Sequence, residues 1–438
     1  MSKTTNTLIS LNNKSYPKPK GRISNSIINE LEKFLESQLP EEIAVMIHEA
    51  DKISGKKIIS LLDHYQLQKL MPEDEPALQL NKAAYIVFDS LTLSFATCSI
   101  TEQMCLGYFP FAPVLPLATA AQYASQAGEL LITSLRESKE HIPVALQVIN
   151  TRYVAGHELL FPGDNILFVA SHQGGRTQVE FVEIGFYNQG IQVGGLDNII
   201  YGLTPISEIV RQYQEHLEYS KVQDYLKKSF SKISIINELE EFLAVEIPDE
   251  LVGKIAELQE KNMVKKVDFL NHNQINNLIP EEPPALNIDK AVLLGIDGNE
   301  LALCTTRINE QMCQGHFSFA PALPLATVGQ QAAQVGEVLI NSVTNQNRQI
   351  THAVLVTEIR ARRNKVLKKD FLFPGDDILY IASYKGQKND CECALTEIYN
   401  KGALMGILKE IDFRLMPQKS IQDQYQNRLT KHVENTEK

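Results

Sequence analysis

A long internal repeat constrains this chain more than any other feature of its sequence. The segment TEQMCLGYFPFAPVLPLATAAQYASQAGELLITS returns 208 positions later as NEQMCQGHFSFAPALPLATVGQQAAQVGEVLINS. Between Glu102 and Ser134, 22 of 33 positions are identical to their counterparts. The Phe-Pro-Gly-Asp turn at 161–164 returns at 373–376, an offset of 212, so the second copy has four extra residues between the two blocks. Such self-similarity predicts two copies of one structural unit. We place a disordered tail at 1–22, the first repeat at 23–225 and the second at 226–430.

Length and composition exclude several classes of protein. With 438 residues, 44% hydrophobic and 22% charged, the chain is long and apolar enough to bury substantial cores. A net charge of −11 argues against nucleic acid or anionic lipid as the main partner. We find no apolar run that could span a membrane and no secretory signal, so the predicted location is the cytoplasm. The six cysteines lack CxxC spacing, and we predict reduced thiols, no metal site and no cofactor.

The order of apolar and turn-forming residues predicts the same elements in each repeat. A leader of about 50 residues begins with Ile28, Leu31 and Leu35 at helical spacing, and Pro40 separates two short helices. Residues 117–135 are rich in Ala, Gly and Gln, which favours a helix enclosed by other structure. β-Branched and aromatic runs follow, separated by turn residues, as in an antiparallel meander.

The repeated segment resembles a known signature. QGHFSFAPALPLATVGQQAAQVGE, and its counterpart LGYFPFAPVLPLATAAQYASQAGE, are similar to bacterial 3-hydroxyacyl-(acyl carrier protein) dehydratases of the hotdog fold, which read approximately GHFPGxPxxPGxxxxEAxAQ. The resemblance covers most of each repeat except the leader. It implies an α+β double hotdog, with two antiparallel sheets each wrapped around a long central helix and extra helices at the start and end of each repeat. The pair forms within one chain, a further homo-oligomer stays open, and the leaders either cap the sheet or bind a partner.

The resemblance also implies site residues. The catalytic histidine of the family corresponds to His316 in the second copy and to Tyr108 in the first. Its acidic partner, fourteen residues later, corresponds to Gln330 and Gln122. Because family sites take the histidine from one unit and the acid from the other, the implied couples are His316 with Gln122 and Tyr108 with Gln330.

Further substrate contacts follow from the same motif. Phe319 stands where the family has glycine. Leu117 and Leu325 begin the central helices, where the family's backbone N–H meets the thioester carbonyl. The leucine side chains are expected to narrow or block the acyl tunnel. Cys313 lies three positions before His316, either near the site or as a buried structural thiol. The expected substrate-binding set is Leu325, Phe319, Cys313, Tyr108, Gln330 and Leu117.

The missing acid limits the chemistry. A neutral imidazole suits removal of the proton next to the carbonyl, whereas Gln122 can orient a hydroxyl but cannot transfer a proton. Losing a positioned acid costs about 10²- to 10⁴-fold in rate. Glu129 and Glu337, about 10 Å further along each helix, are interpreted as solvated or N–H-paired charges, and the alternative is that they support the site through other residues. Cys391 and Cys393 are expected to share one face of a strand, with too few ligands for a metal.

We therefore expect a protein of the 3-hydroxyacyl-thioester dehydratase type, a hydro-lyase of reduced or altered activity. The alternatives are a non-catalytic module that binds acyl thioesters or their carrier, and a hotdog thioesterase. The expected partner is acyl carrier protein or a coenzyme A thioester. The basic residues Arg360, Arg362, Arg363 and Lys365 are candidates for carrier docking, and the alternative is a solvated strand and loop.

Overall fold

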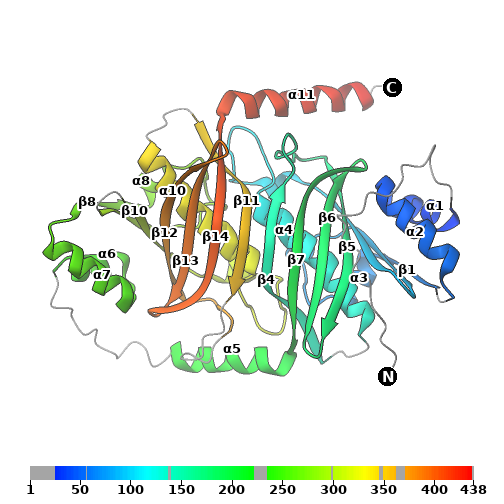
Figure 1. Cartoon of the computed structure of the whole chain (residues 1–438), viewed down its shortest axis with the longest axis horizontal. Coiled ribbons are helices and arrows are strands. Elements are labelled where there is room, and N and C mark those ends of the chain that lie inside the picture. Colours follow the sequence, from blue (N-terminus) through cyan, green and yellow to red (C-terminus); the bar gives the residue numbers. More distant parts are fainter. Residues whose placement is uncertain are drawn as a thin grey trace. The chain divides into compact units, whose positions relative to one another are not determined.

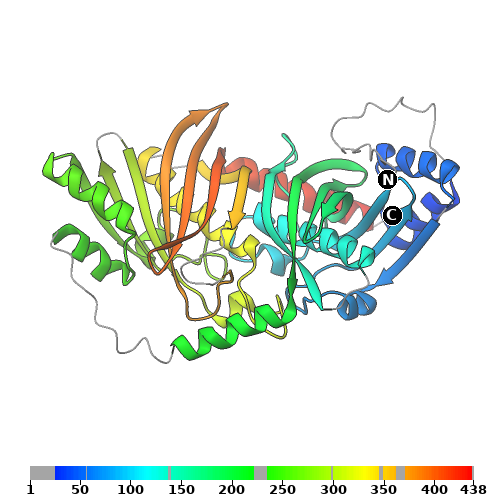
Figure 2. The same ribbon diagram turned by 60° about the horizontal axis from the view of Figure 1, so that its bottom comes forward.

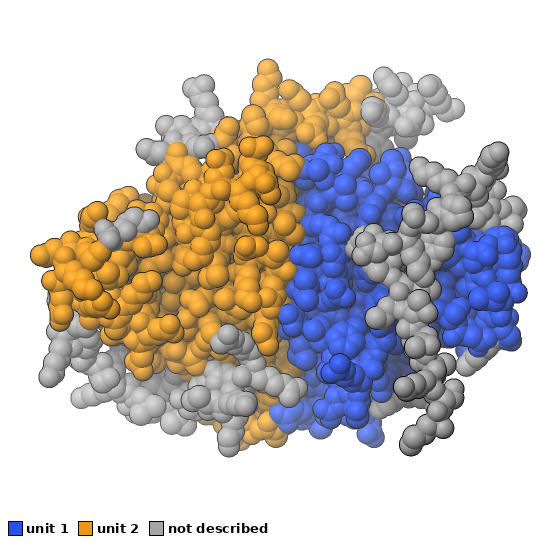
Figure 3. All heavy atoms as spheres, in the orientation of Figure 1, with its two compact units in different colours: residues 1–100, 120–209, 314–319 blue, residues 101–119, 210–313, 320–438 orange. Residues whose placement is uncertain are grey.

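The computed structural model describes residues 25–55, 57–136, 140–220, 234–296, 299–344, 349–361 and 370–436, with the side chains of 219–220 and 431–436 left out. The predicted tail at 1–22 and the predicted boundary between the repeats lie outside these residues. The chain divides into two compact units (Figure 3). Unit 1 comprises 1–100, 120–209 and 314–319, and unit 2 comprises 101–119, 210–313 and 320–438. Each unit therefore contains the body of one repeat and the motif segment of the other.

Unit 1 begins with the helical leader, continues into strands and ends with a meander (Figure 1). Its elements are α1 (Ser26–Leu35), α2 (Glu41–Ile53), β1 (Lys57–Asp63), α3 (His64–Leu70), β2 (Lys82–Phe88), β3 (Thr92–Ser99), α4 (Leu117–Leu135) from residue 120 onward, β4 (His141–Tyr153), β5 (Asn165–Arg176), β6 (Val179–Asn188), β7 (Ile191–Pro205) and the start of α5 (Ile206–Ser220). The strands follow the order β1-β2-β3-β5-β6-β7-β4, and each neighbouring pair is antiparallel.

Unit 2 repeats this plan. The motif segment of the first repeat contributes the short 3-10 helix η1 (Glu102–Cys105). The remaining elements are α6 (Ser234–Leu243), α7 (Asp249–Glu260), β8 (Val264–Asn271), α8 (His272–Asn276), β9 (Lys290–Ile296), β10 (Asn299–Arg307), α9 (Glu310–Cys313), α10 (Leu325–Thr344), β11 (Gln349–Ala361), β12 (Asp377–Lys388), β13 (Cys391–Asn400), β14 (Ala403–Pro417) and α11 (Gln418–Thr436). The order β11-β14-β13-β12-β10-β9-β8 is again antiparallel throughout.

The Ala-, Gly- and Gln-rich segments form helices that lie against the sheets. α10 packs against β10 to β14, and its residues from Val328 to Ile340 are almost all buried (Figure 2). Gly336 lets the helix approach the sheet, because an added Cβ would come within 2.7 Å of the Phe413 ring. In unit 1, Ser94 on β3 donates a hydrogen bond to the carbonyl of Ala127 on α4. Small residues thus allow close helix–sheet packing in both units.

The leaders cover the sheets. In unit 1, Leu31 of α1 and Ile43 of α2 share a hydrophobic cluster with apolar residues of β2, β3 and β5. Pro40 is the N-cap of α2 and separates the two helices, as the sequence predicts. The corresponding cluster of unit 2 joins α6 and α7 to β9, β10 and β12. Of the two roles left open by the sequence, the structure shows the first, because the leader buries an apolar face of the sheet.

Among the described residues, no helix is both long and apolar enough to cross a membrane.

Candidate functional site

The loop that carries His316 belongs to unit 1, where it packs on the turn that follows α3. The backbone N–H of Asp74 donates a 2.7 Å hydrogen bond to the carbonyl of Gly315. Gly315 has φ +78°, and an added Cβ would collide with the Asp74 carbonyl oxygen. Only glycine fits this position without strain. Gln122, on α4, belongs to the same unit.

The His316 ring is half-buried and stacks on Phe317, with ring centroids 4.0 Å apart and an interplanar angle of 21°. Phe317 in turn stacks on Phe319 at 5.6 Å. The first copy has the same arrangement, since Tyr108 stacks on Phe109 at 4.3 Å and Phe109 on Phe111 at 5.6 Å. Both motifs therefore hold three aromatic rings in a row.

The two copies differ in burial, because the Tyr108 side chain is enclosed whereas that of His316 is half-buried. Tyr108 is 2% exposed, and its hydroxyl lies 2.9 Å from Nδ1 of His352 on β11, which is fully buried. Burial lowers the pKa of His352 to about 4, so its ring is neutral at physiological pH. Tyr108 and His352 belong to unit 2 and form a buried hydrogen-bonded pair. His352 was not predicted from the sequence, where its only signal is a histidine inside an apolar strand, ITHAVLV.

The other expected substrate-binding residues have different environments. Phe319 is half-buried in unit 1. Cys313, Leu117, Leu325 and Gln330 belong to unit 2, where Leu117 is buried and Leu325 and Gln330 are half-buried. Burial, with a smaller contribution from Asp376, raises the pKa of Cys313 to about 12. This thiol is inert near neutral pH, in line with the structural alternative.

Two buried carboxyl pairs correct the interpretation of Glu129 and Glu337 as solvated charges. Glu129 on α4 is 7% exposed and pairs with Glu73, which is 2% exposed and precedes Asp74. Glu337 on α10 is 1% exposed and pairs with the fully buried Glu281, 208 residues after Glu73. Burial raises the pKa of Glu73 and of Glu281 to about 7, and burial, followed by the partner carboxyl, raises the pKa of Glu129 and of Glu337 well above the ordinary value. The expectation failed because helical position alone does not reveal which residues enclose the helix. The missed signal was the Pro-Glu dipeptide that both copies share at 72–73 and 280–281.

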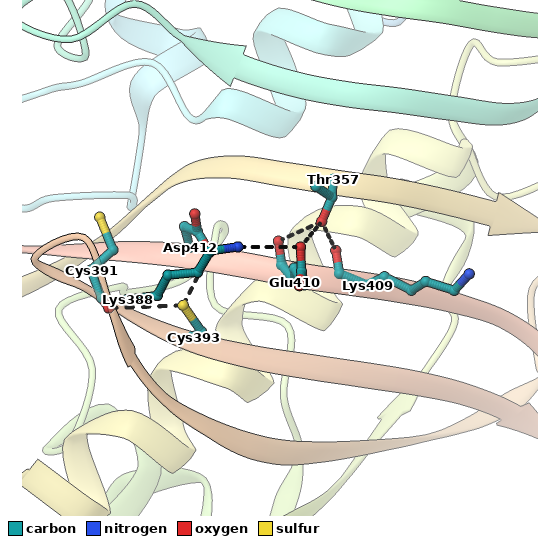
Figure 4. Close-up of polar contacts among 7 residues, drawn as sticks. All are labelled: Thr357, Lys388, Cys391, Cys393, Lys409, Glu410 and Asp412. Carbon is teal, nitrogen blue, oxygen red and sulfur yellow. Dashed lines mark hydrogen bonds and ion pairs between the residues drawn. The ribbon is translucent and has the colours of Figure 1, made fainter.

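The cysteines of β13 lie in a polar network on the sheet of unit 2 (Figure 4). Cys393 donates to a carboxylate oxygen of Asp412 at 3.1 Å, and burial raises the pKa of this thiol to about 12. Next to them, Lys388 pairs with Glu410 at 3.8 Å. Within the described ranges, no cluster of three or more His, Cys, Asp or Glu side chains is arranged to hold a metal ion.

Arg360, the first of the basic residues considered for carrier docking, is exposed near the end of β11. Arg362, Arg363 and Lys365 lie outside the described residues.

Known proteins with similar sequences include several dehydratases. No family model matches the sequence. The 3-hydroxyacyl-(acyl-carrier-protein) dehydratase of Protochlamydia amoebophila is 33% identical over 81 residues, which are 18% of this chain and 53% of that protein. The chain thus spans about half the length of this relative. The corresponding dehydratase of Chlamydia abortus is 24% identical over 160 residues, 36% of this chain and 99% of the relative.

The chain is similar to 3-hydroxyacyl-(acyl-carrier-protein) dehydratases. Among solved structures, the dehydratase domain of a mycocerosic acid synthase-like polyketide synthase superposes with a TM-score of 0.46 at 9% identity. That superposition covers 78% of this dehydratase-like chain and 96% of the domain.

Proposed function

We propose that this chain is a double hotdog of the 3-hydroxyacyl-thioester dehydratase type with one working site, which contains His316. Its substrates are acyl chains carried as thioesters on acyl carrier protein or coenzyme A. The sequence similarity to dehydratases and the central helix packed on an antiparallel sheet in each unit support this proposal.

One observation carries the assignment of the site, namely the asymmetry between the two motif loops. His316 is half-buried, whereas Tyr108 is enclosed and bonded to His352. A phenol with a buried, hydrogen-bonded hydroxyl is a poor base at neutral pH, while a neutral imidazole suits proton removal. The first copy therefore serves as a structural counterpart of the second.

In the proposed dehydration, two residues of unit 1, His316 and Gln122, act on the substrate. His316 removes the proton next to the thioester carbonyl, and the imidazolium returns that proton to the departing hydroxyl. A C–H bond and a C–O bond break, a C=C bond forms and water leaves. Gln122 holds the hydroxyl by hydrogen bonding, because an amide cannot supply the proton. Without a dedicated acid, the rate is expected to be about 10²- to 10⁴-fold below that of a dehydratase that has one. Substrate binding by Leu325, Leu117, Cys313 and Gln330 stays a prediction.

The test uses 3-hydroxyacyl, enoyl and saturated acyl thioesters with four forms of the chain. His316→Ala should abolish hydration and dehydration, Gln122→Glu should raise the rate, and Tyr108→Phe should leave it unchanged. Equal rates for the first variant and the unmodified chain would refute the proposal. A protein that turns over none of these thioesters but gains thermal stability from an acyl carrier protein would be a binding module. Hydrolysis of the saturated thioester would indicate a thioesterase.

Carrier docking on Arg360, Arg362, Arg363 and Lys365 is part of this proposal. Acyl carrier proteins are acidic, and the basic stretch lies in the repeat that keeps the histidine. Reversing the charges of Arg362 and Arg363 should weaken binding of an acyl carrier protein but not of the coenzyme A thioester. Unchanged affinity for the carrier would refute docking on these basic residues.

A further inference from the structure

A turn in unit 1 connects the buried pair Glu73–Glu129 to the loop of His316. On one side, Gln126 of α4 donates a 2.9 Å hydrogen bond to the carbonyl of Ala77 at the end of the turn. On the other side, Asp74, the residue after Glu73, donates its N–H to the carbonyl of Gly315. Glu129 lies about one turn of the helix beyond Gln126. α4 therefore contacts the 73–77 segment at both ends, through Glu73 and through Ala77. The residue that precedes His316 rests on this turn.

The turn and the His316 loop are in close contact at Gly315. A Cβ on Gly315 would collide with the carbonyl of Asp74 and come within 2.9 Å of the Ala77 nitrogen. Closely packed groups transmit displacements instead of absorbing them. A shift of the turn relative to α4 would therefore move the backbone at Gly315 and the imidazole next to it.

We propose that Glu73 and Glu129 are positioning residues for His316, that the protonated pair joins α4 to the turn, and that loss of the Glu73 proton displaces the His316 loop. For its effect on turnover, the proposal rests on the proposed function. The proton of Glu73 passes to solvent, and a carboxylate is then buried between α4 and the turn.

The surroundings of the pair compensate the ionised state only in part, because hydrogen bonds from Glu129 and from the backbone lower the pKa of Glu73 by less than burial raises it. Oε2 of Glu73 and Oε2 of Glu129 are buried without a hydrogen-bond partner. The other titratable groups that act on the pair are Asp74 from the same turn and Tyr201 from β7, and neither brings positive charge at neutral pH. A buried carboxylate without a counterion is strongly unfavourable. The pKa of about 7 for Glu73 puts this change within reach of ordinary buffers.

The second unit supplies a matched control. Glu281 and Glu337 form the same pair, Gln334 donates a 2.7 Å hydrogen bond to the Ala285 carbonyl, and the N–H of Glu282 donates to the Gly107 carbonyl at 2.7 Å. This turn supports the loop of Tyr108. Replacing this pair repeats the chemistry of the first replacement beneath the loop that lacks the histidine.

The experiment compares Glu73→Gln/Glu129→Gln with Glu281→Gln/Glu337→Gln. Glutamine keeps the shape of a protonated glutamate but does not ionise. The first readout is the backbone amide NMR signal of Gly315 between pH 5 and 9 in a His316→Ala chain, which lacks the titration of the imidazole. An inflection near pH 7 should be present in the His316→Ala chain itself. It should vanish when the first double variant is added to this chain and persist when the second is added. Should the first double variant not fold, Glu73→Gln alone should remove the inflection near pH 7, because the carboxyl that has this pKa is gone.

The second readout is the dependence of turnover on pH. The first double variant should move the alkaline limb by more than one pH unit or remove it, and the second should leave it in place. A Gly315 signal that titrates alike in both double variants would overturn the proposal, as would an equal effect of both on the alkaline limb. If no form of the chain turns over thioesters, the proposed function fails and the NMR titration still decides this inference.

Discussion

Replacing Glu281 by glutamine should make unit 2 more stable at alkaline pH. This carboxyl has a pKa of about 7 in the folded chain because of burial, against 4.5 as its ordinary value. A raised pKa means that the unfolded chain releases the proton first, so folding stability is complete below about pH 4.5 and falls as pH rises through 7. At 1.36 kcal/mol per pKa unit, the share of this carboxyl alone is about 3 kcal/mol.

The assay is urea unfolding at pH 5 and pH 8, with Glu282→Gln as the control. Glu282 is the next residue along the turn and is exposed, so its replacement should change neither value. Glu281→Gln should match the unmodified chain at pH 5 and exceed it by about 3 kcal/mol at pH 8. Equal loss of stability between pH 5 and 8 in all three chains would show that Glu281 is already ionised in the folded state at pH 5, and would contradict a protonated buried pair.

Three further outcomes follow from named contacts. Tyr108→Phe removes the hydrogen bond between Tyr108 and His352 in the core and should cost about 1–3 kcal/mol of stability, measured by urea unfolding, without lowering turnover; a loss of turnover as large as that of His316→Ala would contradict the division of roles. Gly315→Ala should lower both the melting temperature and turnover because of the clash at its Cβ. Gly156→Ala has a similar φ of +84° but open space, and should cost only about 1 kcal/mol; equal melting temperatures for these two variants would count against tight packing of the loop. Arg360→Glu should weaken carrier binding about fivefold, measured by calorimetry, and unchanged affinity would exclude this residue from docking.

Local patterns in the sequence were sufficient for most of the elements. α4 spans Leu117–Leu135, the range expected for the central helix, and the break at Pro40 separates α1 from α2. Asp164 accepts a hydrogen bond from the N–H of Phe161 within its Pro-Gly-Asp turn. These features depend on residues close together in the chain, for which periodicity and turn chemistry are good guides.

The candidate site was predicted only in part. The resemblance pointed to His316 and Tyr108 as counterparts, but it could not show that one ring is half-buried and the other enclosed. Tyr108 is hydrogen-bonded to His352, 244 residues away, and no local pattern connects the two residues. Glu129 was misjudged for the same reason, since its partner Glu73 comes from the turn after α3.

The sequence by itself determined the duplication, the order of helices and strands, and the motif that carries the histidine, because each of these is written in neighbouring residues or in their recurrence. Tertiary structure decided which unit each motif loop joins, which loop is closed, and which carboxyls keep a proton. Burial and the pKa of a buried group depend on residues that folding brings together from distant parts of the chain, and these contacts leave no trace in local sequence.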